Sequence, residues 1–355
     1  MNVNSSKSDV IRLIFCSFIT KESVAHDMLE ALITDINQYS LLLISTTSRN
    51  SVQISRLPDK NLNGQPVANI LLTDRKLAQE LFRKIDGQIE NILIDVERKQ
   101  EINLMEIANE VIKRSRVLPY KPNDVTLEAA DQLILHQLGV DLAGKKVLVY
   151  GTGNIAFKLA LRLLEREVDV LIEGRDPEKI QSIVTTLNMI KPRYSCAVAR
   201  PHQEHIDFKY DGLISFLSSE KIIETKMSIH IKPSGFAIDG GIGNFQGTFI
   251  AAALEKDVSV LRLDVRLGNP FLFAGITSLS DENEFFNTVI GSNQVGSMKL
   301  VAGGVIGEAG SIIVDRIKSP TQIIGIANGY GGLKDEKQFT EEDRKNLHYA
   351  KETFI

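Results

Sequence analysis

Two glycines, Gly151 and Gly153, follow an apolar run in KKVLVYGTGN and could hold the phosphates of a dinucleotide. Gly151 permits a tight turn after a strand, and Gly153 lacks a side chain, so a pyrophosphate can approach the backbone. Ala156 stands where a third glycine often lies and still lets a helix pack closely on the strand. The next segment, NIAFKLALRLL, would point its free N–H groups at the phosphates. The pattern predicts a nucleotide-binding turn; the alternative is a glycine turn that binds nothing.

The residues after VDVLI would select the cofactor. Glu173 could bond the ribose 2′-hydroxyl of NAD, whereas Arg175 could accept the 2′-phosphate of NADP. Asp176 would repel a phosphate unless it turned away, and Arg175 could instead be a solvated charge paired with Asp176 or Glu178. We expect NADP, with NAD as the alternative.

The elements that must position these residues alternate between short apolar runs and helical patterns. Over residues 1 to about 120 we expect strands in VIRLIFCSF, YSLLLIST, VANILLT and IENILIDVE, and helices in KESVAHDMLEALITDI, DRKLAQELFRKI and NLMEIANEVIKRS. Such alternation is typical of a mostly parallel sheet with covering helices. The two prolines of VLPYKPND mark the expected domain crossing.

The second half predicts a Rossmann-type sheet. A helix in DVTLEAADQLILHQL, capped by Asp124 or Thr126, leads to strands in KKVLVYG, VDVLIEG, SCAVA, DGLISFL, GFAIDGG and SVLRLDV. GGVIGEAGSIIVDRI would begin a return helix, and DEKQFTEEDRKNLHYAKETF a surface helix. The expected fold class is α/β with two domains. An N-terminal α/β substrate domain spans residues 1–122 and is joined by C-terminal helices at about 308–355, and a parallel-sheet dinucleotide-binding domain spans 123–307.

The order of these motifs resembles the bifunctional methylenetetrahydrofolate dehydrogenase/cyclohydrolase family over nearly the whole chain, with the shikimate dehydrogenases as a second comparison. The likeness is carried by GVDLAGKKVLVYGTGNIAFKLALRLL, by YDGLISFLSSEKIIETKMSIHIKPSGFAIDGGIGNF at 210–245 and by VAGGVIGEAGSIIVD at 301–315. In the family these stretches line the nicotinamide side of the cofactor. The resemblance implies such roles for residues 216–219, Gly241-Ile242 and Gly303-Gly304, and it implies a dimer; the glycine pairs could alternatively be backbone turns only.

The glycine turn, the selector loop and the resemblance together define the predicted cofactor-binding set. Its members are Gly151, Thr152, Gly153, Asn154, Ile155, Gly174, Arg175, Phe216, Leu217, Ser218, Gly241 and Ile242.

The N-terminal half departs from the first family at its folate-contacting elements. Val52 and Arg56 stand where that family carries a Tyr-x-x-x-Lys helix, and Asp95 stands at a folate-contacting glutamine. We therefore expect a small polar metabolite rather than an ordinary folate as the substrate.

Candidate catalytic residues come from the shikimate dehydrogenase comparison, in which a lysine follows the corresponding strand and an aspartate lies downstream. Its counterparts here are Lys99, Lys121 and Asp124. A Lys–Asp pair can bind a hydroxyl and move its proton as hydride leaves the carbon, and burial that lowers the lysine pKa would help. Each could instead be a solvated charge, and Asp124 a helix cap.

Composition bounds the partners. A net charge of -4 without a Lys/Arg run argues against nucleic acid, and the apolar run at 10–19 is about half the length of a membrane span. Two distant cysteines and an N-terminus without signal-peptide features predict a cytoplasmic protein. His202 and His205, expected at the surface, have no carboxylate or thiol partner nearby, so we expect no metal site.

Three functions fit these observations. The first is a homodimeric NAD(P)-dependent oxidoreductase. It would transfer a hydride between the nicotinamide and a small polar metabolite other than an ordinary folate. The second is a one-carbon dehydrogenase acting on methylenetetrahydrofolate or a modified pterin in a rearranged pocket. The third is an NAD(P)-binding sensor or partner subunit that has lost catalysis.

Overall fold

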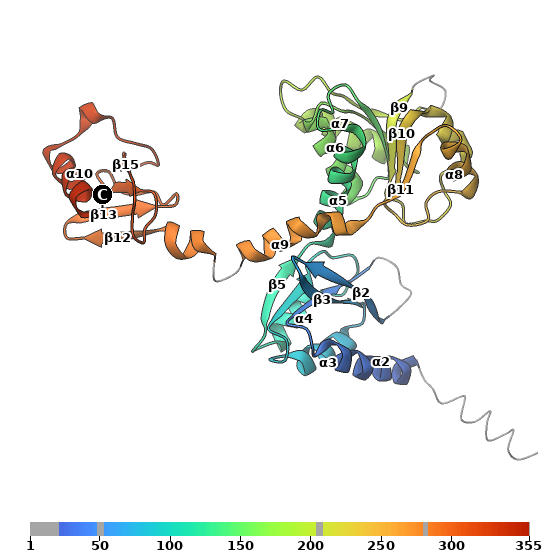
Figure 1. Cartoon of the computed structure of the whole chain (residues 1–355), viewed down its shortest axis with the longest axis horizontal. Coiled ribbons are helices and arrows are strands. Elements are labelled where there is room, and N and C mark those ends of the chain that lie inside the picture. Colours follow the sequence, from blue (N-terminus) through green and yellow to red (C-terminus); the bar gives the residue numbers. More distant parts are fainter. Residues whose placement is uncertain (1–20, 48–52, 204–208, 280–282, 355) are drawn as a thin grey trace, which may run out of the picture. The chain divides into compact units, whose positions relative to one another are not determined.

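The computed structural model describes residues 21–47, 53–203, 209–279 and 283–354. The chain divides into two compact units, Met1–Phe273 and Ala274–Ile355 (Figure 1). In the described residues, the first unit holds a five-stranded and a six-stranded sheet, and the second holds a four-stranded sheet. The strand expected in VIRLIFCSF lies outside the described residues. No helix of the described part has both the length and the apolar character needed to cross a membrane.

The N-terminal sheet has the strand order β2-β3-β1-β4-β5. Its strands are β1 (Leu41–Ser45), β2 (Ile54–Leu62), β3 (Gln65–Leu72), β4 (Asn91–Asp95) and β5 (Arg116–Tyr120). All neighbours are parallel except β2, which pairs antiparallel with β3 through a two-residue turn. In that turn Asn63 and Gly64 both have positive φ, 51° and 89°, as an Asn-Gly hairpin requires.

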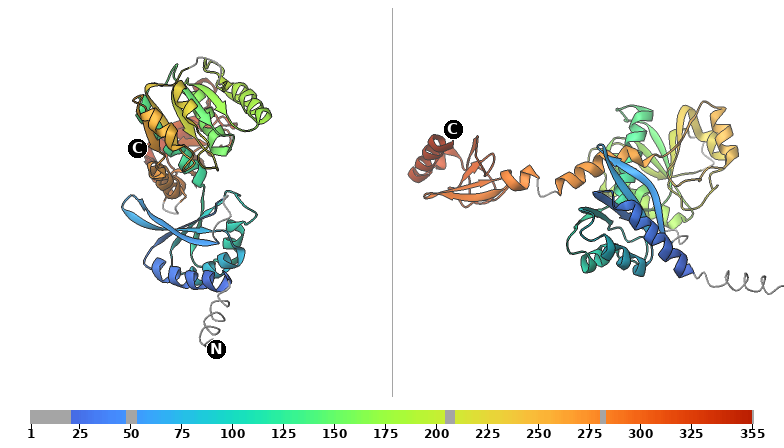
Figure 2. Two further views of the ribbon diagram at one scale, coloured as in Figure 1. Left: turned by 90° about the vertical axis from the view of Figure 1, so that its right-hand side faces the viewer. Right: turned by 60° about the horizontal axis from the view of Figure 1, so that its bottom comes forward.

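Three helices cover one face of this sheet (Figures 1 and 2). They are α2 (Lys21–Ile36), α3 (Arg75–Ile85) and α4 (Leu104–Val111). Ile44, Ile70 and Ile94 are among the strand residues that pack against them. Because side chains alternate along a strand, the neighbours of these residues point to the opposite face. The expected helices and parallel strands are confirmed, but VLPY is strand β5 rather than a crossing.

The second sheet is entirely parallel, with the order β11-β10-β9-β6-β7-β8. Its strands are β6 (Lys146–Tyr150), β7 (Asp169–Glu173), β8 (Ala199–Pro201), β9 (Tyr210–Ser215), β10 (Ile231–Asp239) and β11 (Ser259–Arg262). Each of the six strands overlaps a segment where the sequence predicts one, but β8 shares only Ala199 with the expected SCAVA and β10 begins four residues before GFAIDGG. The chain moves outward from β6 to β8 and then returns to the other side of β6 at β9. This reversal is the switch point at which open α/β sheets bind ligands.

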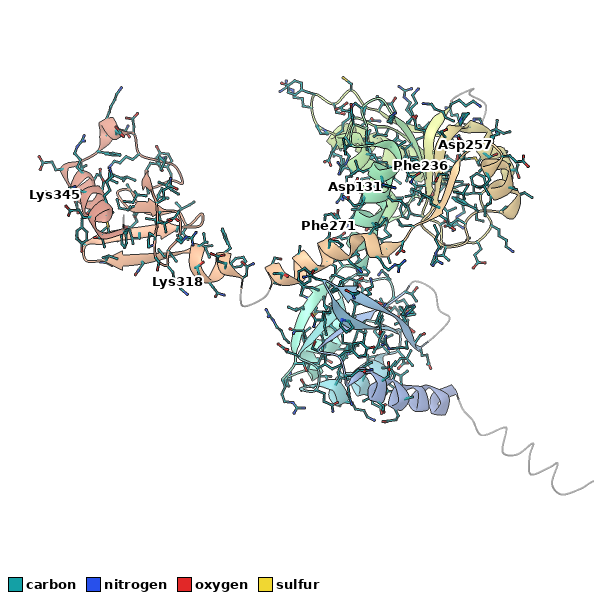
Figure 3. The ribbon with its side chains drawn as sticks, in the orientation of Figure 1. Asp131, Phe236, Asp257, Phe271, Lys318 and Lys345 are labelled. Carbon is teal, nitrogen blue, oxygen red and sulfur yellow. The ribbon has the colours of Figure 1, made fainter. Side chains whose placement is uncertain are left out.

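Helices cover both faces of the second sheet. One face carries α5 (Pro122–Leu138), α6 (Asn154–Glu165) and α7 (Pro177–Ile190), and the other carries α8 (Gly247–Leu254) with the 3-10 helix η1 (Thr225–His230). Asp131 of α5 is buried, and its Oδ2 lies 3.4 Å from Arg162 Nη1 and 2.6 Å from Arg166 Nη2 (Figure 3). These ion pairs join α5 to the helix that follows the glycine turn.

The second unit has its own sheet and core. Its elements are β12 (Gly291–Val295), β13 (Met298–Ala302), β14 (Ile312–Val314), β15 (Ile323–Ile326), η4 (Glu336–Gln338) and α10 (Glu341–Phe354), and the chain reaches them through η2 (Val265–Gly268), α9 (Asn269–Ser278) and the π-helix η3 (Phe285–Val289). The parallel pair is β13 with β14, and the other two pairs are antiparallel. Buried Leu300, Ile312 and Ala350 are among the residues that join the sheet to α10.

Residues 308–355 are therefore grouped differently from the expectation that they join the N-terminal domain. The return helix expected in GGVIGEAGSIIVDRI is absent from this segment, and the structure has a turn followed by β14 there. Gly303 and Gly304 have φ of 66° and 87°, a left-handed conformation that ends regular structure, and Ile312-Ile313-Val314 are β-branched residues suited to a strand. The surface helix expected in the tail is confirmed as α10.

Asp343 stabilises the start of α10. Its carboxylate accepts hydrogen bonds from Thr340 N at 2.7 Å and Lys334 Nζ at 2.5 Å, while Thr340 Oγ1 accepts from Asp343 N at 3.1 Å. This is a reciprocal capping arrangement at a buried carboxylate. Burial acts to raise the pKa of Asp343, but the Lys334 and Thr340 hydrogen bonds outweigh it and hold the pKa below its ordinary value.

We expect Asp343→Asn to lower the free energy of unfolding of the second unit by about 1 to 2 kcal/mol at neutral pH. A carboxyl group whose folded pKa is lowered stabilises above its unfolded pKa of about 4, and the stabilisation is lost as pH falls through the folded value. The variant should therefore differ from the parent at pH 7 and converge with it in strong acid. Urea unfolding at several pH values tests this, with exposed Glu341→Gln as the control; a constant difference between parent and variant would contradict it.

Candidate dinucleotide-binding site

The two glycines in the turn between β6 and α6 have different roles. Gly151 has φ of 145°, and a Cβ there would lie 2.8 Å from the carbonyl oxygen of Phe216 at the end of β9. Gly151 N donates to the carbonyl of Glu173 at 2.9 Å, which ties the turn to β7. A Cβ at Gly153, by contrast, would meet no protein atom within 4 Å. The fold therefore requires glycine at 151, whereas the missing side chain at 153 keeps the surface open.

A hollow of about 420 Å³ opens over this turn, within the size range of small-ligand sites. It is lined by Tyr150, Gly151, Thr152, Gly153, Gly174, Arg175, Asp176, Lys179, Phe216, Leu217, Ser218, Ser219 and Ile222. The ends of β6, β7 and β9 thus contribute together, as the parallel sheet requires. Four residues of the predicted cofactor set lie outside this lining: Asn154, Ile155, Gly241 and Ile242. Their contact with a cofactor stays a prediction.

Helix α6 begins at the floor of the hollow without a side-chain cap. Its N-cap is Gly153, no side chain bonds to its first N–H groups, and its first turn carries no acidic residue. Uncapped N–H groups and the positive end of the helix dipole favour an anion at this position. The backbone here can therefore hold phosphate groups.

Two cations lie at the rim beyond β7. Arg175 and Lys179 are exposed, and neither takes part in an ion pair with another described residue. Asp176 caps α7, because its Oδ1 accepts from Glu178 N and Lys179 N at 3.1 Å each. Its carboxylate is thus turned toward its own helix, and the Arg175–Asp176 pairing considered from the sequence does not form. Lys179 was not predicted from the sequence, although Asp-Pro-Glu at 176–178 is a helix-start signal. That signal would have placed Lys179 in the first turn of a helix.

Glu173, the alternative selector, is engaged within the protein. Its Oε1 accepts from Gly174 N at 2.9 Å, and its Oε2 lies 2.8 Å from His202 Nδ1. The His202 side chain is only 4% exposed and lies edge-on to the ring of Tyr210. The expectation of a surface histidine was wrong for His202, because β8 leads it inward beside β7; His205 lies outside the described residues.

The loop after β10 braces the wall of the hollow. Asp239 accepts hydrogen bonds from the backbone of Gly241, Gly243 and Asn244 at 2.6 to 3.1 Å. The Asn244 side chain in turn bonds Leu217 N at 3.1 Å and Leu217 O at 3.0 Å. A Cβ at Gly241 would lie 2.3 Å from Leu217 O, so this close passage explains the glycine without a ligand.

The three predicted catalytic residues fall into two groups. Lys99 Nζ lies 2.9 Å from Asp95 Oδ2 and 3.3 Å from Glu97 Oε2. Lys121 caps the start of α5 through its backbone and is 60% exposed, and its Nζ lies 3.1 Å from Asp124 Oδ2. The structure thus brings Lys121 and Asp124 together but gives Lys99 other partners.

Asp124 is a helix first-turn residue rather than the N-cap. Its Oδ1 also lies 2.5 Å from Lys158 Nζ of α6. Partial burial acts to raise the pKa of Asp124, but hydrogen bonds from Lys158 and Lys121 outweigh it and keep the pKa below its ordinary value. At neutral pH the group is a carboxylate held by two ammonium groups, which makes it a weak proton acceptor.

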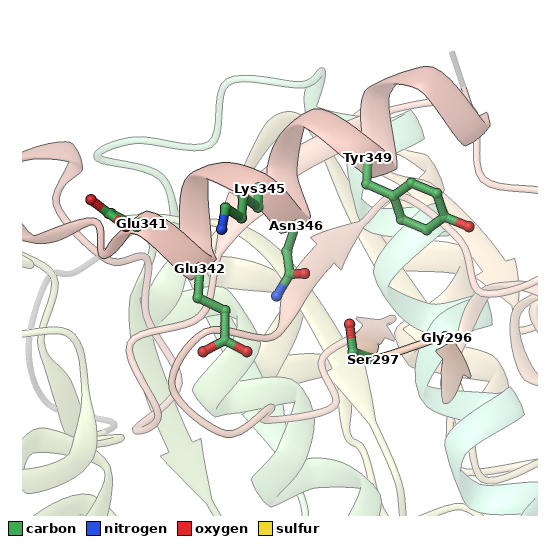
Figure 4. A pocket seen from close by; sticks show the side chains of 7 residues that line it. All are labelled: Gly296, Ser297, Glu341, Glu342, Lys345, Asn346 and Tyr349. Atoms are coloured by element: carbon green, nitrogen blue, oxygen red, sulfur yellow. The ribbon is translucent and has the colours of Figure 1, made fainter.

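The second unit carries another hollow, between the β12–β13 turn and α10 (Figure 4). Gly296 and Ser297 form one side, and Glu342, Lys345 and Asn346 of α10 face them. Its lining mixes charges of both signs, and Glu341 and Glu342 in the first turn of α10 would oppose an anion at that helix N-terminus. The hollow over the turn of β6 is therefore the better candidate site.

The strand order and the glycine turn at the switch point define an α/β protein with a Rossmann-type sheet. No family model matches the sequence, and no curated protein matches it. Similar solved structures include L-tryptophan dehydrogenase from Nostoc punctiforme, at 15% identity and a TM-score of 0.40 over 63% of this chain and 66% of that one. A shikimate dehydrogenase in complex with NADP+ matches at 12% identity and a TM-score of 0.42, over 62% and 83%.

A third neighbour is the dipicolinate synthase A chain from Bacillus subtilis, at 14% identity and a TM-score of 0.35 over 70% and 80% of the two chains. The chain spans about two thirds of the length of the tryptophan dehydrogenase. The solved neighbours are Rossmann dehydrogenases and related enzymes, whereas the resemblance to the methylenetetrahydrofolate dehydrogenases stays a prediction. The functional argument for this protein rests on the residues of its own chain and not on this likeness.

We expect Gly153→Val to fold normally and to weaken NADPH binding at least tenfold, about 1.4 kcal/mol. The Cβ of the new side chain would meet no protein atom within 4 Å, so the side chain would extend into the open space above the turn. Gly151→Ala should instead lower the free energy of unfolding, because its Cβ would contact Phe216 O. Fluorescence titration with NADPH and urea unfolding of both variants test this pair. Unchanged binding by Gly153→Val would remove the phosphates from this turn.

Proposed function

We propose that the protein is an NAD(P)-dependent oxidoreductase that transfers a hydride between the nicotinamide and a small polar metabolite. The observation that carries the proposal is the open Gly153 surface above the uncapped N-terminus of α6, at the switch point between β6 and β9. Bare backbone and free N–H groups suit a pyrophosphate. The cofactor supplies the hydride chemistry, and the chain binds and orients it.

NADP is the proposed cofactor in preference to NAD. Arg175 and Lys179 line the hollow with no ion-pair partner among the described residues, so both cations are available to a 2′-phosphate. Asp176 is turned to the start of α7 and does not oppose such a phosphate. Glu173, which would select NAD, already holds Gly174 N and His202.

The substrate side is proposed from the polar ends of the N-terminal strands and the start of α5. Lys121 and Asp124 can bind a hydroxyl group, and Lys99 adds a second cation near Asp95 and Glu97. Oxidation of an alcohol moves its hydride to the nicotinamide and its proton to one of these groups or to water. The homodimer and the cytoplasmic location expected from the sequence are proposed with this function.

A sensor or partner subunit that binds NADP without turnover is the second candidate. The ion pairs of Lys99, and those of Asp124 with Lys121 and Lys158, favour it, because groups held in this way transfer protons poorly. A one-carbon dehydrogenase is less well supported. Arg56 lies in strand β2, paired with Asp35 and Asp59, rather than on a Tyr-x-x-x-Lys helix, and Val52 lies outside the described residues.

Arg175→Ala should weaken NADPH binding about tenfold and leave NADH binding nearly unchanged, because only NADPH carries the 2′-phosphate. Lys179→Ala should act in the same direction. Arg193→Ala removes an exposed cation from the same domain, outside the hollow, and should change neither affinity. Isothermal titration with both cofactors provides the measurement. A larger loss for NADH would make Glu173 the selector.

Hydride transfer is tested by following NADPH absorbance with panels of hydroxy acids, amino acids, oxo acids and methylenetetrahydrofolate. We expect turnover with at least one small polar metabolite, and loss of turnover with Gly153→Val. Tight NADPH binding without turnover of any of them would support the sensor instead. No binding of either nicotinamide cofactor would overturn both proposals.

A further inference from the structure

Lys60 lies in an unusual electrostatic position in the N-terminal sheet. It is half-buried on β2, and its Nζ lies 3.5 Å from Tyr120 Oη at the end of β5 and 5.9 Å from the centre of the Tyr120 ring. No described carboxylate lies within ion-pairing distance of Lys60. A partly desolvated ammonium without a counterion is costly, and burial lowers the pKa of Lys60.

Lys99, in the loop that follows β4, provides the contrast. Its ammonium contacts both Asp95 and Glu97, so its charge is compensated inside the protein. Asp95 is also committed, because its carboxylate accepts from Thr46 N at 3.2 Å and Glu97 N at 2.8 Å. Asp95 and Glu97 thus have other partners, and no described carboxylate compensates the positive charge of Lys60.

Tyr120 adds a second donor beside this charge. Burial, together with the nearby Asp95 and Glu97 carboxylates, raises the pKa of Tyr120 far above neutrality, so its hydroxyl keeps its proton. The hydroxyl oxygen accepts from Lys60, and no described group accepts its proton. Lys60 and Tyr120 therefore present converging N–H and O–H donors to one small acceptor.

An unpartnered hydroxyl marks the same edge of the sheet. Thr46 follows β1 and is 5% exposed, and its Oγ1 has no hydrogen-bond partner among the described residues. Its backbone N donates to Asp95, which pairs in register with Tyr120. Buried polar groups without partners are rare, so this edge has capacity for a polar ligand.

We propose that Lys60 and Tyr120 bind the carboxylate of a small acidic metabolite, with the Lys60 ammonium as its counterion and the Tyr120 hydroxyl as a hydrogen-bond donor. The proposal deepens the oxidoreductase function by assigning its substrate to the small carboxylic acids, and as a binding site it can be tested without the cofactor. Two adjacent donors, one of them charged, can satisfy both oxygens of a carboxylate. Binding would favour the charged amine and raise the Lys60 pKa.

The test is a pH titration of the lysines in the full chain, methylated with 13C-formaldehyde and followed by NMR. Lys60→Met assigns the Lys60 signal by its loss. We expect Lys60 to titrate below the ordinary lysine value of about 10.4, and pyruvate at constant ionic strength to raise the Lys60 pKa by about one unit, a tenfold change in proton affinity. Acetamide, the neutral control, should have no effect.

Tyr120→Phe keeps the ring and removes the hydroxyl, and it should reduce the pyruvate effect at least threefold. A Lys60 signal that titrates at the ordinary lysine value, or that does not respond to pyruvate, would overturn the proposal. An equal response to chloride or phosphate would also overturn it, because the site would then bind any anion. The outcome is independent of NADPH: failed cofactor binding would remove the oxidoreductase and leave a carboxylate site.

Discussion

The close approach of Gly151 to the carbonyl oxygen of Phe216 is the constraint on which the candidate site depends. It brings the chain leaving β6 against the end of β9, where the two halves of the parallel sheet diverge. Any side chain at 151 would force these strand ends apart. Because the turn is so tight, α6 begins three residues later, at Asn154, with its first N–H groups at the switch point. The open surface at Gly153 then follows from the turn and needs no further support.

The polar residues around this turn act through the partners that their local structure gives them. Asp176 is an acid beside a proposed phosphate site, yet its carboxylate caps α7. It is therefore turned away from the rim and does not oppose a phosphate there. The Glu173 carboxylate is likewise bonded within the protein, to Gly174 N and to His202. The net result is a rim whose uncommitted charges are Arg175 and Lys179. The proposed preference for NADP thus rests on helix capping as much as on residue type.

Short-range patterns were sufficient to predict the second sheet and its turn. The apolar runs at β6, β7 and β9 are separated by helical periodicity, and glycine chemistry is local. The second unit was missed because β12, with the sequence GSNQV, is polar and no helix separates the four short strands β12 to β15. The Lys60–Tyr120 contact was missed for another reason: it joins residues 60 positions apart in the chain, from strands that are not sheet neighbours. Only the three-dimensional fold shows which of several lysines lacks a carboxylate.

Lys60 and Lys99 also show how structural and binding charges differ. A lysine retained for stability gains most when a carboxylate lies beside it, as Asp95 lies beside Lys99 at 2.9 Å. Lys60 is partly buried without that compensation, and the hydrogen-bond partner that the described residues give it is the neutral Tyr120 hydroxyl. Replacing such a lysine with an apolar residue of similar size would relieve a desolvation cost, so folding alone gives no reason for an ammonium there. The carboxylate of a bound substrate would give such a reason, because it supplies the missing negative charge when the site is occupied.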